Sequence, residues 1–362
     1  MNATNTVSFP RMTPANLPAP ISGPSVWVAH DLAQDQHAWL HTLSNAEIAE
    51  LETAAEHFAA LGKDLGQITA ADFPLPSFAH HLTALQDKLL SGNGIEVMRG
   101  LPTHTFDQRK AATVFCGIGA HLGSARSQNA KGHILGHVRD TGVSSTSAQV
   151  RIYQTAERQT FHTDSADVVG LLCLNEAKEG GDSLLVSAAT LYNRMYADAP
   201  ELLCRLFDPI ATDRRGEVPE GAKPFMQIPP LSWHAGKLTA FYQRQYIDSA
   251  QRFDEALRLT PEHIAALDMF DALANDPTLH FRMRLRPGDM QFVYNHAQLH
   301  DRTGFTDWSE QDKRRHLLRL WLSLPGDRAL PDCFRERYGD ITPGQRGGII
   351  CAGTALNAPL DA

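Results

Sequence analysis

Residues 167–187, DVVGLLCLNEAKEGGDSLLVS, hold two short strand-like runs, and the connection between them ends in Gly180-Gly181. The runs 167–174 and 182–187 are short and apolar and are bounded by turn residues, which is typical of β-strands in a buried sheet. We therefore expect these residues to form two strands, and we expect the fold around them to be built mainly of β-structure.

Similar runs continue on both sides of this stretch, and turn residues such as Pro287-Gly288-Asp289 separate them. They are spread over about half of the chain without a strict alternation of strand and helix. A mostly antiparallel barrel or jelly roll with helical additions therefore fits better than a doubly wound sheet. The further expected strands are 148–155, 238–247, 280–286, 290–294 and 317–324, and inserted helices are expected at 187–197 and 261–273.

The first third of the chain has a helical pattern. Ser44 and Glu47 form a capping box ahead of an apolar periodicity, and Gly62 is a suitable stop for that helix. Two further helices are expected over 77–90 and 105–123, with Thr105 and Gln108 opening the last of them, and a strand is expected over 94–100.

The order of these elements predicts one domain rather than two. We expect an extended leader over 1–30 and a single domain over 31–362. Within this domain, the helical part covers about 31–125, the β core about 126–330 and a C-terminal tail 331–362.

Composition excludes several classes of protein. The 362 residues include 20% charged and 43% hydrophobic residues, which is ordinary for a globular chain. The net charge of −8 gives no general attraction to nucleic acid. No apolar run is long enough to span a membrane, and the N-terminus lacks a secretory pattern. The scattered cysteines contain no C-x-x-C pair, which favours a reducing, cytoplasmic location; they are Cys116, Cys173, Cys204, Cys333 and Cys351.

The sharpest local signal for chemistry is the pair His162-x-Asp164. Alternate residues of a strand share a face, so the imidazole and the carboxylate can point to the same side. With one more distant histidine they would form the two-histidine, one-carboxylate set that binds Fe(II) and leaves sites open. A single pair of this kind also arises by chance, so the remaining ligand decides its meaning.

The segment 288–322 offers that third ligand and a binding site for an anion. His300 follows a strand-like run and is the preferred ligand, with His296 as its rival. Arg315 and Arg319 are four residues apart, so on a strand both side chains point to the same face. An arginine in a barrel interior is costly unless it meets an anion, and its planar fork suits a carboxylate.

Four blocks in this order resemble the taurine/2,4-dichlorophenoxyacetate dioxygenase family of Fe(II)/2-oxoglutarate-dependent oxygenases, including its clavaminate synthase-like members. The resemblance covers about residues 95–330. The blocks are FHTDSADVVGLLCL (161–174), EGGDSLLVS (179–187), GDMQFVYNHAQLHDRTGF (288–305) and RRHLLRLWLS (314–323).

The resemblance implies a double-stranded β-helix, the jelly roll of this family, and Fe(II), 2-oxoglutarate and O2 as cofactor and cosubstrates. His162, Asp164 and His300 match the iron ligands of the family. Arg315 matches the arginine that binds the distal carboxylate of 2-oxoglutarate, and Ser183 matches a hydroxyl residue that meets the same group. The implied reaction is oxidation, normally hydroxylation, of an unactivated C–H bond with release of succinate and CO2.

The resemblance points to a small anionic substrate such as an amino acid, a carboxylate or a sulfonate. Arg319 matches an arginine that reaches the acidic group of the substrate or assists with the cosubstrate. Each of the other candidate residues fits a core or rim position equally well. The substrate candidates are Arg319, Phe161, Ser165, Asp167, Gln128, Asn129, Trp233 and Tyr242.

Two alternatives from other classes remain at this point. A β-barrel hydrolase or isomerase could use the same three residues to hold a metal as a Lewis acid, and it would need no arginine at position 315. A non-catalytic metal-binding scaffold could keep the fold alone. A homo-oligomer is compatible with the sequence, which does not determine the oligomeric state.

Overall fold

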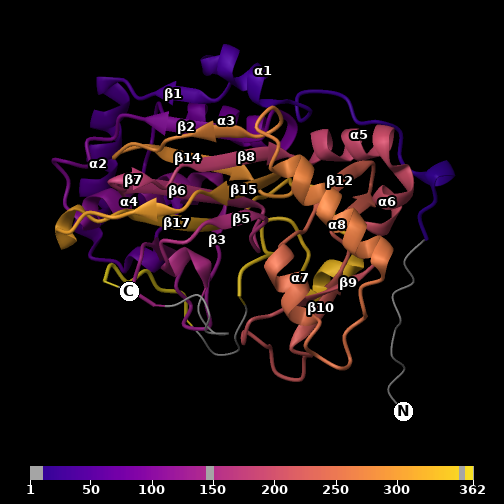
Figure 1. The fold of residues 1–362 in the computed structure, drawn as a ribbon. Coiled ribbons are helices and arrows are strands. Elements are labelled where there is room, and N and C mark those ends of the chain that lie inside the picture. The colour runs from indigo at the N-terminus through magenta and orange to yellow at the C-terminus, as the bar shows by residue number, and fades with distance from the viewer. Residues whose placement is uncertain (1–10, 144–150, 350–354, 362) are drawn as a thin grey trace.

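The computed structural model describes residues 11–143, 151–349 and 355–361, and it contains two main β-sheets with helices on their outer sides (Figure 1). The larger sheet has seven strands, and every pairing in it is antiparallel except that of β1 with β2. Its strands follow the order β1 (Leu40–Thr42), β2 (Ile95–Arg99), β14 (Met290–Tyr294), β6 (Val168–Asn175), β17 (His316–Ser323) and β3 (Ser124–Ala125), and β4 (Leu135–Val138) also pairs with β17.

The smaller sheet has four strands, all antiparallel, and it brings distant parts of the chain side by side. His300 lies opposite His162 on one side and opposite Leu185 on the other. Its order is β13 (Phe281–Met283), β8 (Ser183–Ser187), β15 (Gln298–Arg302) and β5 (Gln159–His162).

The stretch that predicts β-structure links these two sheets. Its first run is β6 of the larger sheet and its second run is β8 of the smaller one, so the chain crosses from one sheet to the other at Gly180-Gly181. Both glycines have a φ of +74°, which other residues adopt only with strain. The connection includes β7 (Glu179–Gly180), which pairs with β16 (Phe305–Thr306).

Alternation along the strands decides what lies between the sheets. On β17, Leu318 and Leu320 pack toward the helices, whereas Leu317 belongs to the apolar cluster between the sheets. On β8, Leu184 faces outward and Leu185 faces that same inner cluster. Alternate side chains of a strand point to the same face. The polar residues at the other inward-facing positions therefore lie between the sheets and not on the outer surface.

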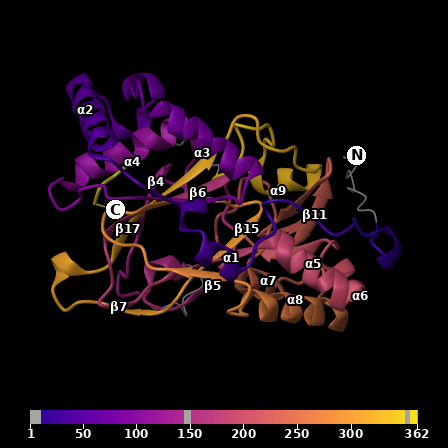
Figure 2. The same ribbon diagram turned by 90° about the horizontal axis from the view of Figure 1, so that it is seen from above.

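Two groups of helices cover the outer faces of the sheets (Figure 2). The capping box of α2 is confirmed, since the Ser44 hydroxyl accepts the Glu47 N–H and the Glu47 carboxylate accepts the Ser44 N–H; the helix ends at Gly62 with a φ of +63°. The larger sheet is covered by α2 (Asn45–Leu61), α3 (Ala79–Ser91) and α4 (Gln108–Leu122), and the smaller one by α5 (Ala188–Asp198), α6 (Pro200–Arg205) and α8 (Pro261–Ala274).

The remaining elements close the ends of the two sheets. In the region expected as a leader, Leu17 and Trp27 are buried, and Trp27 belongs to the cluster between the sheets. No helix in the described parts of the chain could span a membrane. These elements are α1 (Ala29–Gln34), β9 (Ile210–Asp213), β10 (Phe225–Ile228), β11 (Leu231–His234), β12 (Lys237–Ala240), α7 (Arg244–Ala250) and α9 (Arg335–Tyr338).

Three sequence predictions of local structure are wrong. The expected strand 148–155 is a short 3-10 helix over Ile152–Gln154, and residues 148–150 lie outside the described residues. The expected strand 238–247 ends at Ala240, and α7 begins at Arg244. The helix expected from Thr105 begins at Gln108, because the Asp107 carboxylate caps it by accepting the Lys110 N–H at 2.7 Å.

The segment after β17 returns to the core through a buried arginine. Arg346 is 0% exposed; it donates to Asp167 and to Asp327, each at 2.7 Å. His296 binds the same Asp167 carboxylate at 2.8 Å. This ionic cluster anchors the segment that carries α9 against the larger sheet and thereby places α9 beside the site described next.

Candidate metal centre and two adjoining pockets

Three potential metal ligands converge where β5 and β15 pair. Asp164 Oδ1 lies 3.9 Å from His162 Nε2, and Asp164 Oδ2 lies 3.6 Å from His300 Nε2. One ligand atom from each of the three residues lies within 4.8 Å of the others. The register that sets His300 opposite His162 is therefore what assembles two histidines and one carboxylate, a donor set that suits a divalent first-row metal.

Hydrogen bonds and burial prepare the His162 imidazole for a metal. Its Nδ1 lies 2.8 Å from the Thr160 carbonyl, so Nδ1 carries the proton and Nε2 is the acceptor, which lies 2.8 Å from the Gln159 side-chain amide nitrogen. Burial, with His300 as a second cause, lowers the pKa of His162 to about 3. The imidazole is thus neutral at physiological pH, which is the form that binds metals.

Side-chain hydrogen bonds hold one of the two carboxylate oxygens of Asp164. Its Oδ2 accepts hydrogen bonds from Trp321 Nε1 at 2.8 Å and from Arg319 Nη1 at 3.2 Å. Burial acts to raise the pKa of this carboxyl, but Arg319 and His300 outweigh it, and the pKa lies below its ordinary value. The group is therefore an ionised carboxylate whose Oδ1 faces His162.

A cavity opens on one side of this centre and contains an arginine that has no anionic partner among the described residues. Arg315 is 4% exposed, and its Nη1 has no hydrogen-bond partner among the described residues. Burial lowers the pKa of Arg315 to about 10. Ser183 and Gln291 line the same cavity. A buried guanidinium in this state is a ready site for a carboxylate.

Gly181 makes room for that guanidinium. A Cβ at this position would lie 2.9 Å from Arg315 Nε and 3.2 Å from Arg315 Cδ. The turn that connects the two sheets therefore also leaves the space that the Arg315 side chain occupies.

Arg302 also lines this cavity, and sequence reasoning did not single it out. It donates to the carbonyls of Thr155 and Glu157, and its pKa is lowered to about 9 by burial and by Arg315. In the sequence it stands beside Asp301, which suggests a pair between neighbours. The Asp301 carboxylate instead binds Arg158 at 2.6 Å, because successive strand residues point to opposite faces.

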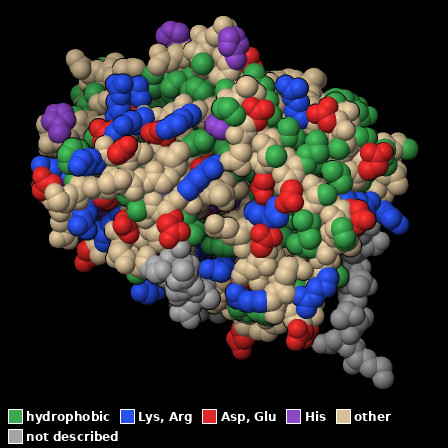
Figure 3. Space-filling model, in the orientation of Figure 1, with side chains coloured by type: hydrophobic (Ala, Val, Ile, Leu, Met, Phe, Trp, Pro, Cys, Tyr) green, Lys and Arg blue, Asp and Glu red, His purple; other side chains and the backbone are tan. Residues whose placement is uncertain are grey.

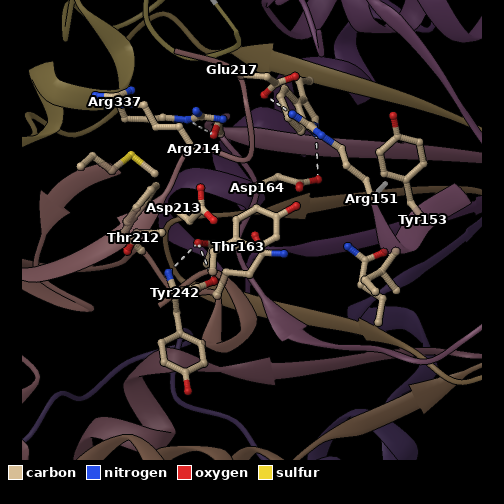
Figure 4. A pocket seen from close by; sticks show the side chains of 18 of the residues that line it. Arg151, Tyr153, Thr163, Asp164, Thr212, Asp213, Arg214, Glu217, Tyr242 and Arg337 are labelled. Atoms are coloured by element: carbon tan, nitrogen blue, oxygen red, sulfur yellow. Dashed lines mark hydrogen bonds and ion pairs between the residues drawn. The ribbon is translucent and has the colours of Figure 1, made fainter. Parts of the chain in front are cut away.

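A second cavity lies on the other side of the metal centre (Figure 4). Tyr153, Gln159, Asp164 and Arg319 line both cavities, so the centre stands between them. Figure 3 shows a hollow near the middle of the face that Figure 1 presents, with basic and acidic side chains at its rim. The charged residues that line the second cavity are Arg151, Asp164, Asp213, Arg214, Glu217, Arg319 and Arg337.

Some predicted substrate residues do reach this second cavity. Ser165, Tyr242 and Arg319 line it. Gln128 is buried beside it; its Oε1 accepts the Arg319 Nε hydrogen bond at 2.8 Å. Arg319 is thus engaged by Gln128 and Asp164, and its predicted contact with a substrate remains a prediction.

Four of the predicted substrate residues do not line either cavity. Phe161 is a core residue that packs near His280. Asp167 belongs to the Arg346 cluster. Asn129 closes a turn by accepting the Lys131 N–H, and Trp233 is 37% exposed on β11. His296 binds Asp167, so the structure places His300 at the centre and not its rival.

Arg151, Arg214, Glu217 and Arg337 were missed from the sequence. They come from a loop, from the residues after β9 and from α9, and no motif or periodicity marks them. The signal that could have found them is weak, since it consists of isolated arginines in segments that carry no other pattern.

Comparisons with known proteins agree with this geometry. The family model described as "Taurine catabolism dioxygenase TauD, TfdA family" matches residues 58–321. FR-33289 synthase of Streptomyces rubellomurinus (strain ATCC 31215) is 33% identical over 332 residues, which cover 89% of this chain and 96% of that protein. The taurine hydroxylase-like protein SAT17 of Stachybotrys chartarum (strain CBS 109288 / IBT 7711) is 30% identical over 304 residues, which cover 81% of this chain and 77% of that protein.

The fold is also similar to that of a solved enzyme. An asparagine oxygenase in complex with Fe(II), 2S,3S-3-hydroxyasparagine and succinate superposes with a TM-score of 0.62 at 18% identity, covering 78% of this chain and 93% of that one. The family match covers more than half of the chain, and the family prediction is confirmed. The chain belongs to the TauD/TfdA family of Fe(II)/2-oxoglutarate-dependent dioxygenases.

Proposed function

We propose that His162, Asp164 and His300 bind Fe(II), and that Arg315, with the Ser183 hydroxyl, binds the distal carboxylate of 2-oxoglutarate. The observation that carries this assignment is the position of Arg315. It is a buried cation with no anionic partner among the described residues, in a cavity that the two histidines and the carboxylate also line. A hydrolase that used the metal as a Lewis acid would need no such cation, so this arrangement favours the oxygenase.

The substrate is proposed to enter the second cavity, where Asp164 is the ligand that faces it. Bound Fe(II), with 2-oxoglutarate and O2, supplies the oxidising power for hydroxylation of a substrate C–H bond. The chain keeps His162 neutral for the metal and holds Asp164 ionised through Trp321 and Arg319. The arginines of the second cavity make a small anionic molecule the expected substrate.

The sheet topology and the cysteines support two further proposals, on the fold and on the location of the protein. The two mainly antiparallel sheets that share an inner cluster are proposed to form a double-stranded β-helix, with the site between them. A reducing cytoplasm is the proposed location, and the described cysteines, Cys116, Cys173, Cys204 and Cys333, are all buried free thiols.

Single substitutions test the ligand assignment. His162→Ala and His300→Ala should each abolish Fe(II) binding in anaerobic calorimetry and abolish succinate release, because each removes one of three ligands. His234→Ala is the control, since His234 is an exposed residue of β11 away from both cavities, and it should leave both measurements unchanged. Unchanged succinate release by His162→Ala would refute the assignment.

A further inference from the structure

Two arginines lie next to one another at one end of the second cavity (Figure 4). Arg214 directly follows β9 and is 5% exposed; its Nη2 donates to the Glu336 carbonyl, and its Nε has no partner among the described residues. Arg337 comes from α9, and its Nε donates to the Ser165 hydroxyl at 2.6 Å. Both guanidinium groups line the cavity that Asp164 also lines.

The carboxylates around this cavity do not neutralise the two arginines. Three carboxylates line the cavity, and each already has a cation of its own. The pairs are Asp164 with Arg319 at 3.2 Å, Asp213 with Arg252 at 3.0 Å, and Glu217 with Arg151.

No ion pair joins Arg214 or Arg337 to a carboxylate in the described part of the chain. The nearby Glu336 is exposed, and its carboxylate accepts the Gln227 N–H. Burial, and then Arg337, lowers the pKa of Arg214 to about 10, and the opposing effect of Glu336 is smaller. Arg214 is buried and Arg337 is half-buried, and Glu217, the carboxylate whose charge acts most on Arg337, already pairs with Arg151. Two adjacent cations that share so little negative charge are unfavourable, so this part of the cavity is arranged for an anion.

We propose that Arg214 and Arg337 bind a tetrahedral, dianionic PO3 group of the substrate, in either a phosphonate or a phosphate monoester. This inference rests on the proposed function, since it names the substrate class of the same site. A phosphate monoester carries about −1.5 to −2 charges at pH 7 and three acceptor oxygens, which matches two guanidinium forks. A carboxylate or a sulfonate carries a single negative charge and would leave one arginine uncompensated.

The position of the pair also fits a substrate that spans the cavity. Asp164 lines the same cavity, so a molecule whose PO3 group rests on Arg214 and Arg337 can present its carbon chain to the metal centre.

Four probes with one shared aminoethyl body test the head-group preference. They are 2-aminoethylphosphonate, O-phosphoethanolamine, taurine and β-alanine, each titrated by anaerobic calorimetry into the protein loaded with Fe(II) and 2-oxoglutarate. The two PO3 probes should bind at least about tenfold more tightly than the sulfonate and the carboxylate, because each charged hydrogen bond contributes to affinity. The ranking of the two PO3 probes then distinguishes a phosphonate from a phosphate ester.

Substitutions test whether the preference for a PO3 group depends on Arg214 and Arg337. Arg214→Met and Arg337→Met should each weaken the PO3 probes about 10- to 100-fold and leave 2-oxoglutarate affinity unchanged. Arg335→Met is the matched control, because Arg335 lies on the same short helix, pairs with Asp332 and does not line the second cavity. Arg214→Lys, which keeps the charge, should retain part of the affinity and guards against misfolding of the methionine variant.

Three results would overturn the inference: equal or tighter binding of taurine or β-alanine, no binding of either PO3 probe, or unchanged PO3 binding in both methionine variants. Titration of 2-oxoglutarate in the same samples distinguishes failure of the PO3 inference from failure of the proposed function. If 2-oxoglutarate binds and the PO3 preference is absent, the inference alone fails. If 2-oxoglutarate does not bind, the proposed function fails, and PO3 binding to the metal-free protein still tests the arginine pair.

Discussion

Replacing Arg315 by methionine should destroy 2-oxoglutarate binding and at the same time stabilise the ligand-free protein. Arg315 is 4% exposed and has no anionic partner in the described part of the chain. Its pKa is lowered to about 10 from an ordinary value of 12.5, and this corresponds to a cost of about 3 kcal/mol for the charged form. Methionine has a similar length and no charge, so relief of about 1–3 kcal/mol is expected.

The effect on the cosubstrate has the opposite sign. Loss of two charge-assisted hydrogen bonds costs about 3–5 kcal/mol, so the Kd for 2-oxoglutarate should rise about 150- to 5,000-fold. Arg315→Lys should fall between the two, because it keeps the charge and loses the planar fork. Arg314→Met is the matched control, since Arg314 is the preceding residue, is exposed and donates to the Trp308 carbonyl.

Anaerobic calorimetry of 2-oxoglutarate into the Fe(II)-loaded protein and thermal unfolding of the metal-free protein measure the two effects. The expected result for Arg315→Met is a higher Tm together with lost cosubstrate affinity. A variant that keeps its 2-oxoglutarate affinity, or an Arg314→Met that loses it, would refute the reasoning.

Three further predictions follow from single contacts. Gly181→Ala should raise the KM for 2-oxoglutarate, whereas Gly221→Ala, with the same φ of +74° and no atom near a new Cβ, should not. Trp321→Phe should weaken Fe(II) binding about 10- to 100-fold in calorimetry, because Asp164 loses a hydrogen bond of 2.8 Å. Burial lowers the pKa of His316 to about 4 from 6.5, so the unfolded chain takes up the proton first and stability should fall from pH 6.5 to 4; His316→Gln should flatten that slope in unfolding experiments.

The sequence predicts best where structure and chemistry follow a local period. Arg315 directly precedes β17 and Arg319 lies in it, and both line the cavity of the metal centre, as their spacing predicts. His162 is the last residue of β5 and Asp164 follows two residues later, and the two remain together. In each case the residues are close in the sequence, so the prediction needs little knowledge of the tertiary structure.

The second cavity could not be predicted in this way. Arg214 and Arg337 are more than a hundred positions apart, and α9 reaches the site through long-range contacts, which include the anchoring of Arg346 to Asp167 and Asp327 and the packing of Tyr338 beside β10. Asp167 is a sequence candidate for the substrate wall, yet its carboxylate accepts a hydrogen bond from that buried arginine. Such pairings depend on long-range packing, which no spacing in the sequence reveals.

The most direct test of the central claim is an anaerobic titration of the metal-free protein with Fe(II) and then 2-oxoglutarate, followed by visible absorbance. The account predicts a weak charge-transfer band that appears only when both are present, and that is absent from His162→Ala and from Arg315→Met at the same concentrations. Binding of Fe(II) without any band on addition of 2-oxoglutarate would contradict the assignment of the two cavities.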